Sequence, residues 1–184
     1  RSRGLGDVYK RQTGDDFKKL TQLGKDLGAS TAWSAQECAE AMQYTGMAGW
    51  TAKENIDGLK GILDLASASG TDLARTSDIM TDAISAFGYK ASDSAKFADV
   101  MTKACTSANV SVDTLGESYK YCGAICGTMG YSIDEITTSL AVMGNMGIKS
   151  SQAGTTLKNA ISNMAAPTKN MKAAMDDLGI SIGN

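Results

Sequence analysis

The stretch GYSIDEITTSLAVMGNMGIKSSQAG (residues 130–154) decides the fold. We interpret it as a turn, a helix, a second turn and the start of another helix. Gly130 suits a left-handed backbone after a preceding helix, because glycine has no Cβ to clash there. Residues Ser132 to Glu135 form a capping box, in which the serine oxygen accepts from the N–H of Glu135 and the glutamate reaches back to the cap. We therefore expect a helix to begin at Ser132.

The same stretch predicts where that helix ends and which face it buries. Gly147 ends the helix, and Ile148 repeats the apolar anchor that Tyr131 provides at the other turn. Ser150 or Ser151 then begins the next helix. Apolar side chains recur at spacings of three and four, as on one face of an amphipathic helix, and they are Ile133, Ile136, Leu140 and Met143.

The junction recurs elsewhere in the chain, and we interpret its residues as structural turns and caps. The sequence Gly-Trp-Thr-Ala-Lys-Glu (49–54) is the same junction with a second full capping box, residues 88–93 are a looser copy, and residues 179–181 look like another. The candidate turn and cap residues are Gly49, Trp50, Glu54, Gly88, Tyr89, Gly130, Tyr131, Ser132, Glu135, Gly147, Ile148 and Gly154.

Residues 34–50 also match residues 132–148 at a constant offset, with Ser34 over Ser132, Glu37 over Glu135 and Gly49 over Gly147. One interpretation is an old duplication. The other is that two helices of similar length need the same caps.

Read in order, the pattern predicts an all-α fold: a compact array of about eight or nine short amphipathic helices joined by glycine turns. No period-two alternation persists, so we expect no strand. The predicted helices cover residues 15–27, 34–49, 52–68, 72–87, 91–108, 111–129, 132–146, 150–165 and 168–178, with Gly28 ending the first and Pro167 in the first turn of the last. The predicted inward side chains include Phe17, Ile56, Cys105, Met129 and Met164.

Seven segments carry a family resemblance: AMQYTGMAGW (41–50), ASGTDLARTSDIMTDAISAFG (68–88), DSAKFADVM (93–101), GESYKY (116–121), GYSIDEI (130–136), GIKSSQAGTTLKN (147–159) and AAPTKNM (165–171). Together they resemble the core region of phage tail tape measure proteins, from about residue 20 to 178. The resemblance implies a structural role in tail assembly, as a scaffold and length ruler in the lumen of the tail tube, and ejection on infection.

That resemblance also implies partners and a place. The expected partners are the tail tube protein, tail assembly chaperones and baseplate or tail-tip proteins, with self-association in the lumen; transient contact with the host membrane is an open alternative. The expected location is the virion tail, after assembly in the host cytoplasm, and a prophage is one origin that the resemblance allows. Direct nucleic-acid binding is not expected, because the net charge is −2 and no basic cluster is present.

The two ends shape the domain division. Residues 1–12, RSRGLGDVYKRQ, lack apolar periodicity and resemble a translated sequencing adapter. We therefore divide the chain into this foreign-looking segment and a helical domain over residues 13–184, which we expect to be a fragment of a longer protein.

The sequence leaves two alternative functions to consider. The stretches 121–133 and 136–148 are uncharged, which is typical of a buried helical hairpin and alternatively of a membrane-active module that assists genome delivery. A hydrolase is not expected, because histidine is absent and no catalytic constellation remains. No catalytic, cofactor or metal site is expected: the four cysteines fall on apolar faces without CxxC spacing, and free cysteine packs as a small hydrophobe.

Overall fold

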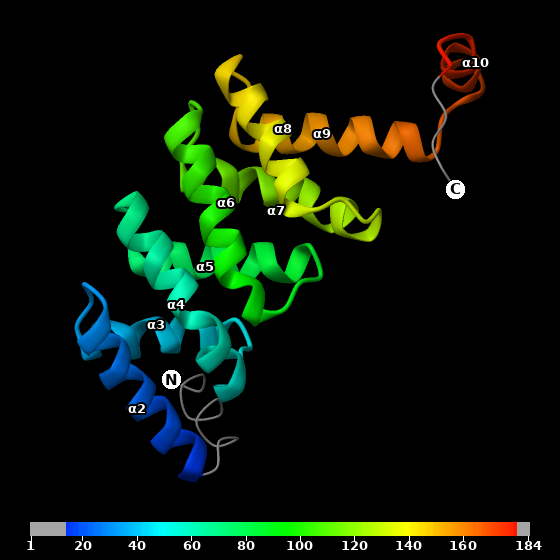
Figure 1. Cartoon of the computed structure of the whole chain (residues 1–184). Helices are drawn as coiled ribbons and strands as arrows, with labels where there is room; N and C mark the ends of the chain where they lie inside the picture. The colour runs from blue at the N-terminus through cyan, green and yellow to red at the C-terminus, as the bar shows by residue number, and fades with distance from the viewer. Residues whose placement is uncertain (1–13, 180–184) are drawn as a thin grey trace, which may run out of the picture.

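The computed structural model describes residues 14–179, in which helices are joined by short turns and no strand is present (Figure 1). Nine α-helices and one short 3-10 helix follow one another within this range, which confirms the predicted all-α array. They are α2 (Gly14–Ser30), α3 (Ala35–Met47), α4 (Ala52–Ser69), α5 (Leu73–Ala86), η1 (Ala91–Asp93), α6 (Ser94–Ser107), α7 (Val112–Thr128), α8 (Ile133–Asn145), α9 (Ser150–Ala165) and α10 (Lys169–Asp177).

The helices form two rows, because each helix packs against the next helix but one. One row contains α2, α4, α6 and α8, and the other contains α3, α5, α7 and α9. Neighbours in a row run in the same direction: Lys96 near the start of α6 pairs with Asp134 near the start of α8 at 2.8 Å, and Val110 beyond the end of α6 meets Gly144 near the end of α8. The result is an open-ended stack rather than a closed bundle.

The repeating unit of the stack is a helical hairpin, formed by α3–α4, α5–α6 and α7–α8. The first helix of each hairpin begins at a side-chain cap, Ser34, Asp72 or Ser111, about 38 residues apart. The sequence match noted above pairs α3 with α8, which lie in different rows. Both helices have 13 residues, a capping box and the same terminal turn; the old duplication stays an untested alternative to shared length and caps.

Small residues let neighbouring helices of a row approach closely. Gly58 and Gly61 of α4 face η1 and the start of α6, and a Cβ added to Gly61 would lie 2.6 Å from the carbonyl carbon of Ser94. Ser94 Oγ donates a hydrogen bond to the Gly58 carbonyl at 2.7 Å. In the other row, a Cβ on Gly116 of α7 would lie 2.7 Å from the Ile79 side chain. These glycines act through backbone proximity, since any side chain would separate the helices.

The core runs the length of the stack and is centred on aromatic side chains. Phe87 contacts Tyr119 and Phe97 edge to face, at ring-centroid distances of 5.5 and 6.1 Å. Tyr119 reaches α8, where its hydroxyl lies 2.6 Å from the hydroxyl of Thr137. Tyr119 of α7 is thus a buried aromatic residue whose hydroxyl has a hydrogen-bond partner on α8 and whose ring contacts Phe87 at the end of α5.

Several predicted inward side chains are exposed instead. Phe17 and Ile56 are 56% and 44% exposed, Met129 and Met164 are 43% and 40% exposed, and Cys105 is half-buried. The prediction was wrong because periodicity shows which face of a helix is apolar, but not how much of that face a neighbouring helix covers. α4 buries Leu59, Ile62, Leu63, Leu65 and Ala66 but turns Ile56 outward.

Some predicted boundaries also differ. Gly28 does not end the first helix, which continues to Ser30. Gly28 instead faces Ala35: a Cβ added to Gly28 would lie 2.6 Å from the backbone nitrogen of Ala35. The segment 91–108 divides into η1 and α6, and Pro167 precedes the cap residue Thr168 rather than occupying the first helical turn.

The foreign-looking segment 1–12 and the turn residues Ile180 and Ser181 lie outside the described residues, so the division into 1–12 and 13–184 stays a prediction. Within residues 14–179, none of the helices combines the length and apolar character that crossing a membrane requires. The uncharged stretches 121–133 and 136–148 form the end of α7, the following turn and α8, and many of their side chains are buried in the stack.

Candidate functional site

The recurring structural feature is a glycine turn that closes α3, α5, α7 and α8. Four of the five predicted turn and cap glycines have left-handed backbone: φ is +98° at Gly49, +73° at Gly88, +79° at Gly130 and +86° at Gly147. A Cβ added at any of the four would meet nothing within 4 Å. Glycine is therefore favoured there for its backbone conformation and not for space.

Each of these turns makes the same hydrogen bonds. The residue after the glycine donates its N–H to the carbonyl five residues earlier, and the glycine donates to the carbonyl three residues earlier. This is the Schellman arrangement, which satisfies the last carbonyls of a helix. The longer bonds are Trp50 to Thr45 at 3.0 Å, Tyr89 to Ile84 at 3.0 Å, Tyr131 to Cys126 at 2.9 Å and Ile148 to Met143 at 2.9 Å.

The residue after each glycine anchors the turn on the core. Trp50 is buried and its ring packs over Gly58 of α4. Tyr89 packs edge to face on Phe97 at 5.2 Å, with the Lys96 ammonium 5.7 Å from the centre of its ring. Tyr131 and Ile148 are half-buried against the same core. The anchor fixes the angle at which one helix follows another.

The predicted capping glutamates complete the start of the next helix. Glu54 accepts from the N–H and hydroxyl of Thr51, both at 2.7 Å, and Glu135 accepts from the N–H and hydroxyl of Ser132, both at 2.8 Å. These hydrogen bonds lower the pKa of both carboxyl groups, the backbone N–H having the larger effect. A carboxyl group held in this way is ionised at neutral pH and caps the helix.

Gly154 lies inside α9 and not at a turn. A Cβ there would lie 2.3 Å from the Ser118 carbonyl oxygen of α7. Beside it, Ser118 Oγ lies 2.8 Å from the carbonyl oxygen of Ser150, whose φ of +53° is left-handed. This point, where α9 crosses α7, is the tightest contact in its row, and the sequence pattern did not distinguish its glycine from the turn glycines.

The thiols lie in apolar surroundings. Cys38, Cys122 and Cys126 are buried and all four cysteines are free. The pKa of Cys122 is raised, first by its hydrogen bond with Cys126 and then by burial. Within residues 14–179, no group of three or more histidine, cysteine, aspartate or glutamate side chains is placed to hold a metal ion.

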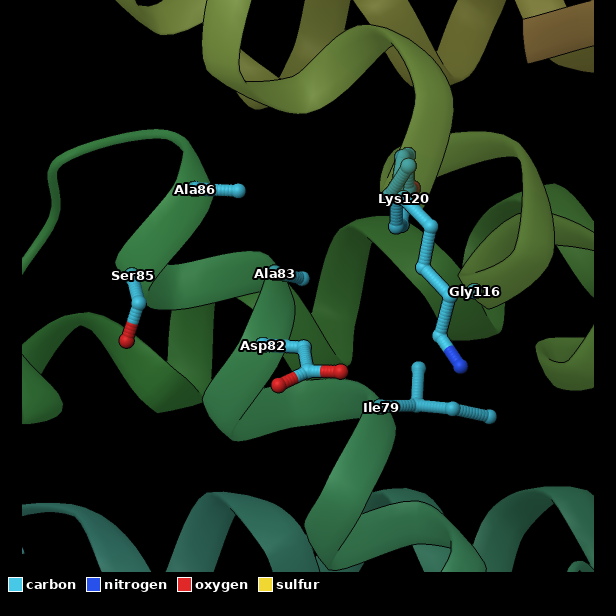
Figure 2. Close-up of a pocket in the computed structure, with 8 residues that line it drawn as sticks. Ile79, Asp82, Ala83, Ser85, Ala86, Gly116 and Lys120 are labelled. Atoms are coloured by element: carbon cyan, nitrogen blue, oxygen red, sulfur yellow. The ribbon is translucent and has the colours of Figure 1, made fainter. Parts of the chain in front are cut away.

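One surface hollow of about 260 Å³ lies between α5 and α7 (Figure 2). Its floor is apolar, with Ile79 and Ala83, while Asp82 and Lys120 stand at its edge. Partial burial raises the pKa of Asp82, and the neighbouring Asp78 carboxylate adds to the shift. No signal in the sequence predicts this hollow, because its lining residues come from two helices far apart in the chain.

The fold and these sites define a structural α-helical repeat protein, in which the recurring residues are turns, caps and close helix contacts. The chain belongs to the family described as "Phage-related minor tail protein", which it matches over residues 21–184. It is 39% identical over 169 residues to the "Tape measure protein" of Pneumococcus phage Dp-1, covering 92% of this chain and 15% of that protein. It is 24% identical over 169 residues to the "Probable tape measure protein" of Escherichia phage P2, covering 90% and 20%.

These findings confirm the resemblance to tape measure proteins. The chain spans only about a sixth to a fifth of the length of these two relatives. No solved structure matches the chain.

Proposed function

We propose that this chain is a structural segment of a phage tail, acting in tail assembly as a scaffold and as part of the length ruler in the tail tube lumen. The family and the tape measure proteins that the chain resembles support a structural tail role. The observation that carries the finer proposal is the additive build of the stack. A helical hairpin is added about every 38 residues, and its first helix begins at a side-chain cap and ends in a Schellman turn at a glycine, so the length of the segment depends on the number of hairpins.

Two lengths correspond to one hairpin. In the stack, the next helix of a row lies about 8–10 Å away, the usual spacing of packed helices. Drawn out as one continuous helix, residues 72–110, which contain α5 and α6, would span about 60 Å at about 1.5 Å per residue. The length that the segment contributes to the tail depends on which form, stacked or extended, lies in the tail tube.

The test is an in-register deletion of residues 72–110 in a phage that carries this chain in its tail. The deletion joins Thr71 to Ser111, which replaces one helix cap, Asp72, by another. We expect tails shortened by about 60 Å if the segment is extended, or by about 10 Å if it stays stacked. Electron microscopy of purified tails measures the change.

The matched control is a duplication of residues 72–110, which should lengthen tails by the same amount. Leu140→Ala serves as a folding control: it removes a buried side chain without changing the length of the chain, so it should lower tail yield and leave tail length unchanged. Tails of unchanged length in both the deletion and the duplication would contradict the ruler role.

The proposed partners follow from that location. In the virion tail the segment would contact the tail tube protein and other copies of itself, and during assembly the tail chaperones and baseplate or tail-tip proteins. The proposed role is structural and not enzymatic. Cross-linking of assembled tails tests these contacts. We expect peptides from residues 14–179 to be recovered linked to the tube protein.

A further inference from the structure

The hollow between α5 and α7 has the size and lining of a place for side chains. Its volume of about 260 Å³ is below the roughly 300–1,000 Å³ of sites for small molecules. Ile79 and Ala83 of α5 form an apolar floor, and Asp82 of α5 and Lys120 of α7 stand on its two sides (Figure 2). The hollow therefore suits an apolar side chain that is accompanied by a charge.

Asp82 is the charged group at the hollow that lacks a partner. Lys120 on the other side pairs with Glu117 at 3.6 Å. Arg75, the other base of these two helices, pairs with three other carboxylates, the shortest distance being 2.8 Å. Among residues 14–179, no lysine or arginine nitrogen thus lies within 4 Å of the Asp82 carboxylate. A cation from outside the stack would supply the missing partner.

The C-terminal part of the chain carries cations that also lack partners. Residues 136–175 contain four lysines and no aspartate or glutamate. Within the described part of the chain, none of the four forms an ion pair with a carboxylate. The helices α5 and α7 together carry four acidic and two basic residues. Opposite charges on two surfaces favour their encounter and fix how they meet.

The helix α10 combines such a lysine with an apolar face that is not covered. Met171, Met175 and Leu178 recur at spacings of four and three, so they share one face of the helix, and Lys172 lies at the edge of that face. α10 buries no residue and lies beyond the end of α9, apart from the two rows (Figure 1). A helix of nine residues is marginal in water without a surface to pack on.

We propose that α10 of one copy of this chain docks in the hollow between α5 and α7 of a second copy. Met175 then covers the floor formed by Ile79 and Ala83, and Lys172, three residues earlier on the same side, pairs with Asp82. The second copy supplies the cation that the hollow lacks, and the hollow supplies the apolar surface that α10 lacks. The inference rests on the proposed function in one respect: it specifies the contact between copies that this function includes.

Sedimentation equilibrium of the full 184-residue chain at low ionic strength tests the contact. We expect association that increases with protein concentration. Asp82→Lys removes the anion of the hollow, and Met175→Asp removes the apolar contact of α10, so each variant should raise the dissociation constant about tenfold or more. The two variants mixed together should associate more strongly than either alone, because one keeps an intact α10 and the other an intact hollow.

Two matched controls make the same changes in charge elsewhere. Asp64→Lys alters an exposed carboxylate of α4 that pairs with Lys60, and Lys25→Glu alters an exposed lysine of α2. Both should leave the dissociation constant within about twofold of the wild type. Equal weakening in the controls would overturn the proposal, because net charge alone would then account for the effect.

Three further outcomes would also overturn it. They are a wild-type chain that stays monomeric up to about 1 mM, variants that associate like the wild type, and a mixture that associates no better than its parts. Hydrogen exchange supplies a second readout: the amides of α10 should exchange more slowly as the protein concentration rises, and not in Asp82→Lys. Slow exchange that does not depend on concentration would place α10 on its own copy instead.

These measurements use the isolated chain, so their failure is distinct from failure of the proposed ruler role. The ruler role is contradicted by tails of unchanged length in the deletion and the duplication, whether or not copies of the chain associate.

Discussion

The hairpin α5–α6 and the helix pair α9–α10 are built from similar segments and differ in what surrounds them. α5 and α6 each have 14 residues and lie between neighbours on both sides of their rows. α5 buries eight residues, among them Ile79, Met80 and Ile84, while α9 buries three and α10 none. The difference teaches that in an open stack a helix is stabilised by its row neighbours more than by its own sequence.

The same comparison holds for the turns. Gly88 and Tyr89 lock α5 to α6 with a Schellman turn and an anchor on Phe97. The connection from α9 to α10 has neither feature. The interior helices are held by Schellman turns and by row neighbours on both sides, so we expect them to unfold together. Local opening is expected to begin at α9 and α10, which bury fewer residues.

The largest expected effect comes from removing an interior aromatic side chain. Phe97→Ala deletes a fully buried ring that contacts Phe87 and Tyr89, and it should cost about 3–5 kcal/mol of unfolding free energy. The matched control is Phe17→Ala in α2, where the ring is 56% exposed and the cost should stay within about 0.5 kcal/mol. Urea unfolding measures both, and similar costs would contradict the contrast.

A smaller effect is expected where two helices of one row touch. Gly154→Ala places a Cβ 2.3 Å from the Ser118 carbonyl oxygen, a backbone atom that cannot move alone. Overpacking of this kind should destabilise by about 1–3 kcal/mol. Gly14→Ala is the control, because nothing lies within 4 Å of its added Cβ. Thermal unfolding that ranks the two variants in the opposite order would show that α9 does not pack tightly on α7.

The glycine turns are expected to follow in size. Gly147→Val introduces a β-branched residue at φ +86°, with a cost of about 1–3 kcal/mol from backbone strain. Gly147→Asn should cost less, because asparagine tolerates the left-handed region. Equal unfolding midpoints for valine and asparagine would mean that the turn relaxes to another conformation.

The smallest effect is expected at the capping glutamates. Glu135→Gln should leave the urea midpoint at neutral pH almost unchanged, because glutamine also completes a capping box. A large loss of tail assembly in this variant without loss of stability would contradict the structural role of Glu135.

Acidification separates the wild type from the glutamine variant. The folded-state pKa of Glu135 is lowered by its hydrogen bonds to Ser132. Its contribution is therefore complete above the unfolded pKa of about 4.3 and is lost as the pH falls through the lowered folded pKa. A triple variant that changes Glu37, Glu54 and Glu135 to glutamine should lack this part of the acid destabilisation, which unfolding curves between neutral and acidic pH measure.

The sequence alone determined the local structure. Glycine before an apolar residue marked the turns at Gly49, Gly130 and Gly147, and a capping box followed the first two, because these interactions are made within a few residues of the chain. The all-α class and most helix boundaries followed from the same signals. Resemblance in seven segments then pointed to the tape measure proteins.

Only the tertiary structure decided which surfaces meet. Rows of next-but-one helices depend on contacts between residues far apart in the chain, so Gly58, Gly61 and Gly154 were not recognised as contact points. An apolar stripe on a helix predicts burial, but whether Ile56 is covered depends on the position of a neighbouring helix. The physical reason is that caps and turns are local, whereas burial is a property of two surfaces brought together by the whole chain.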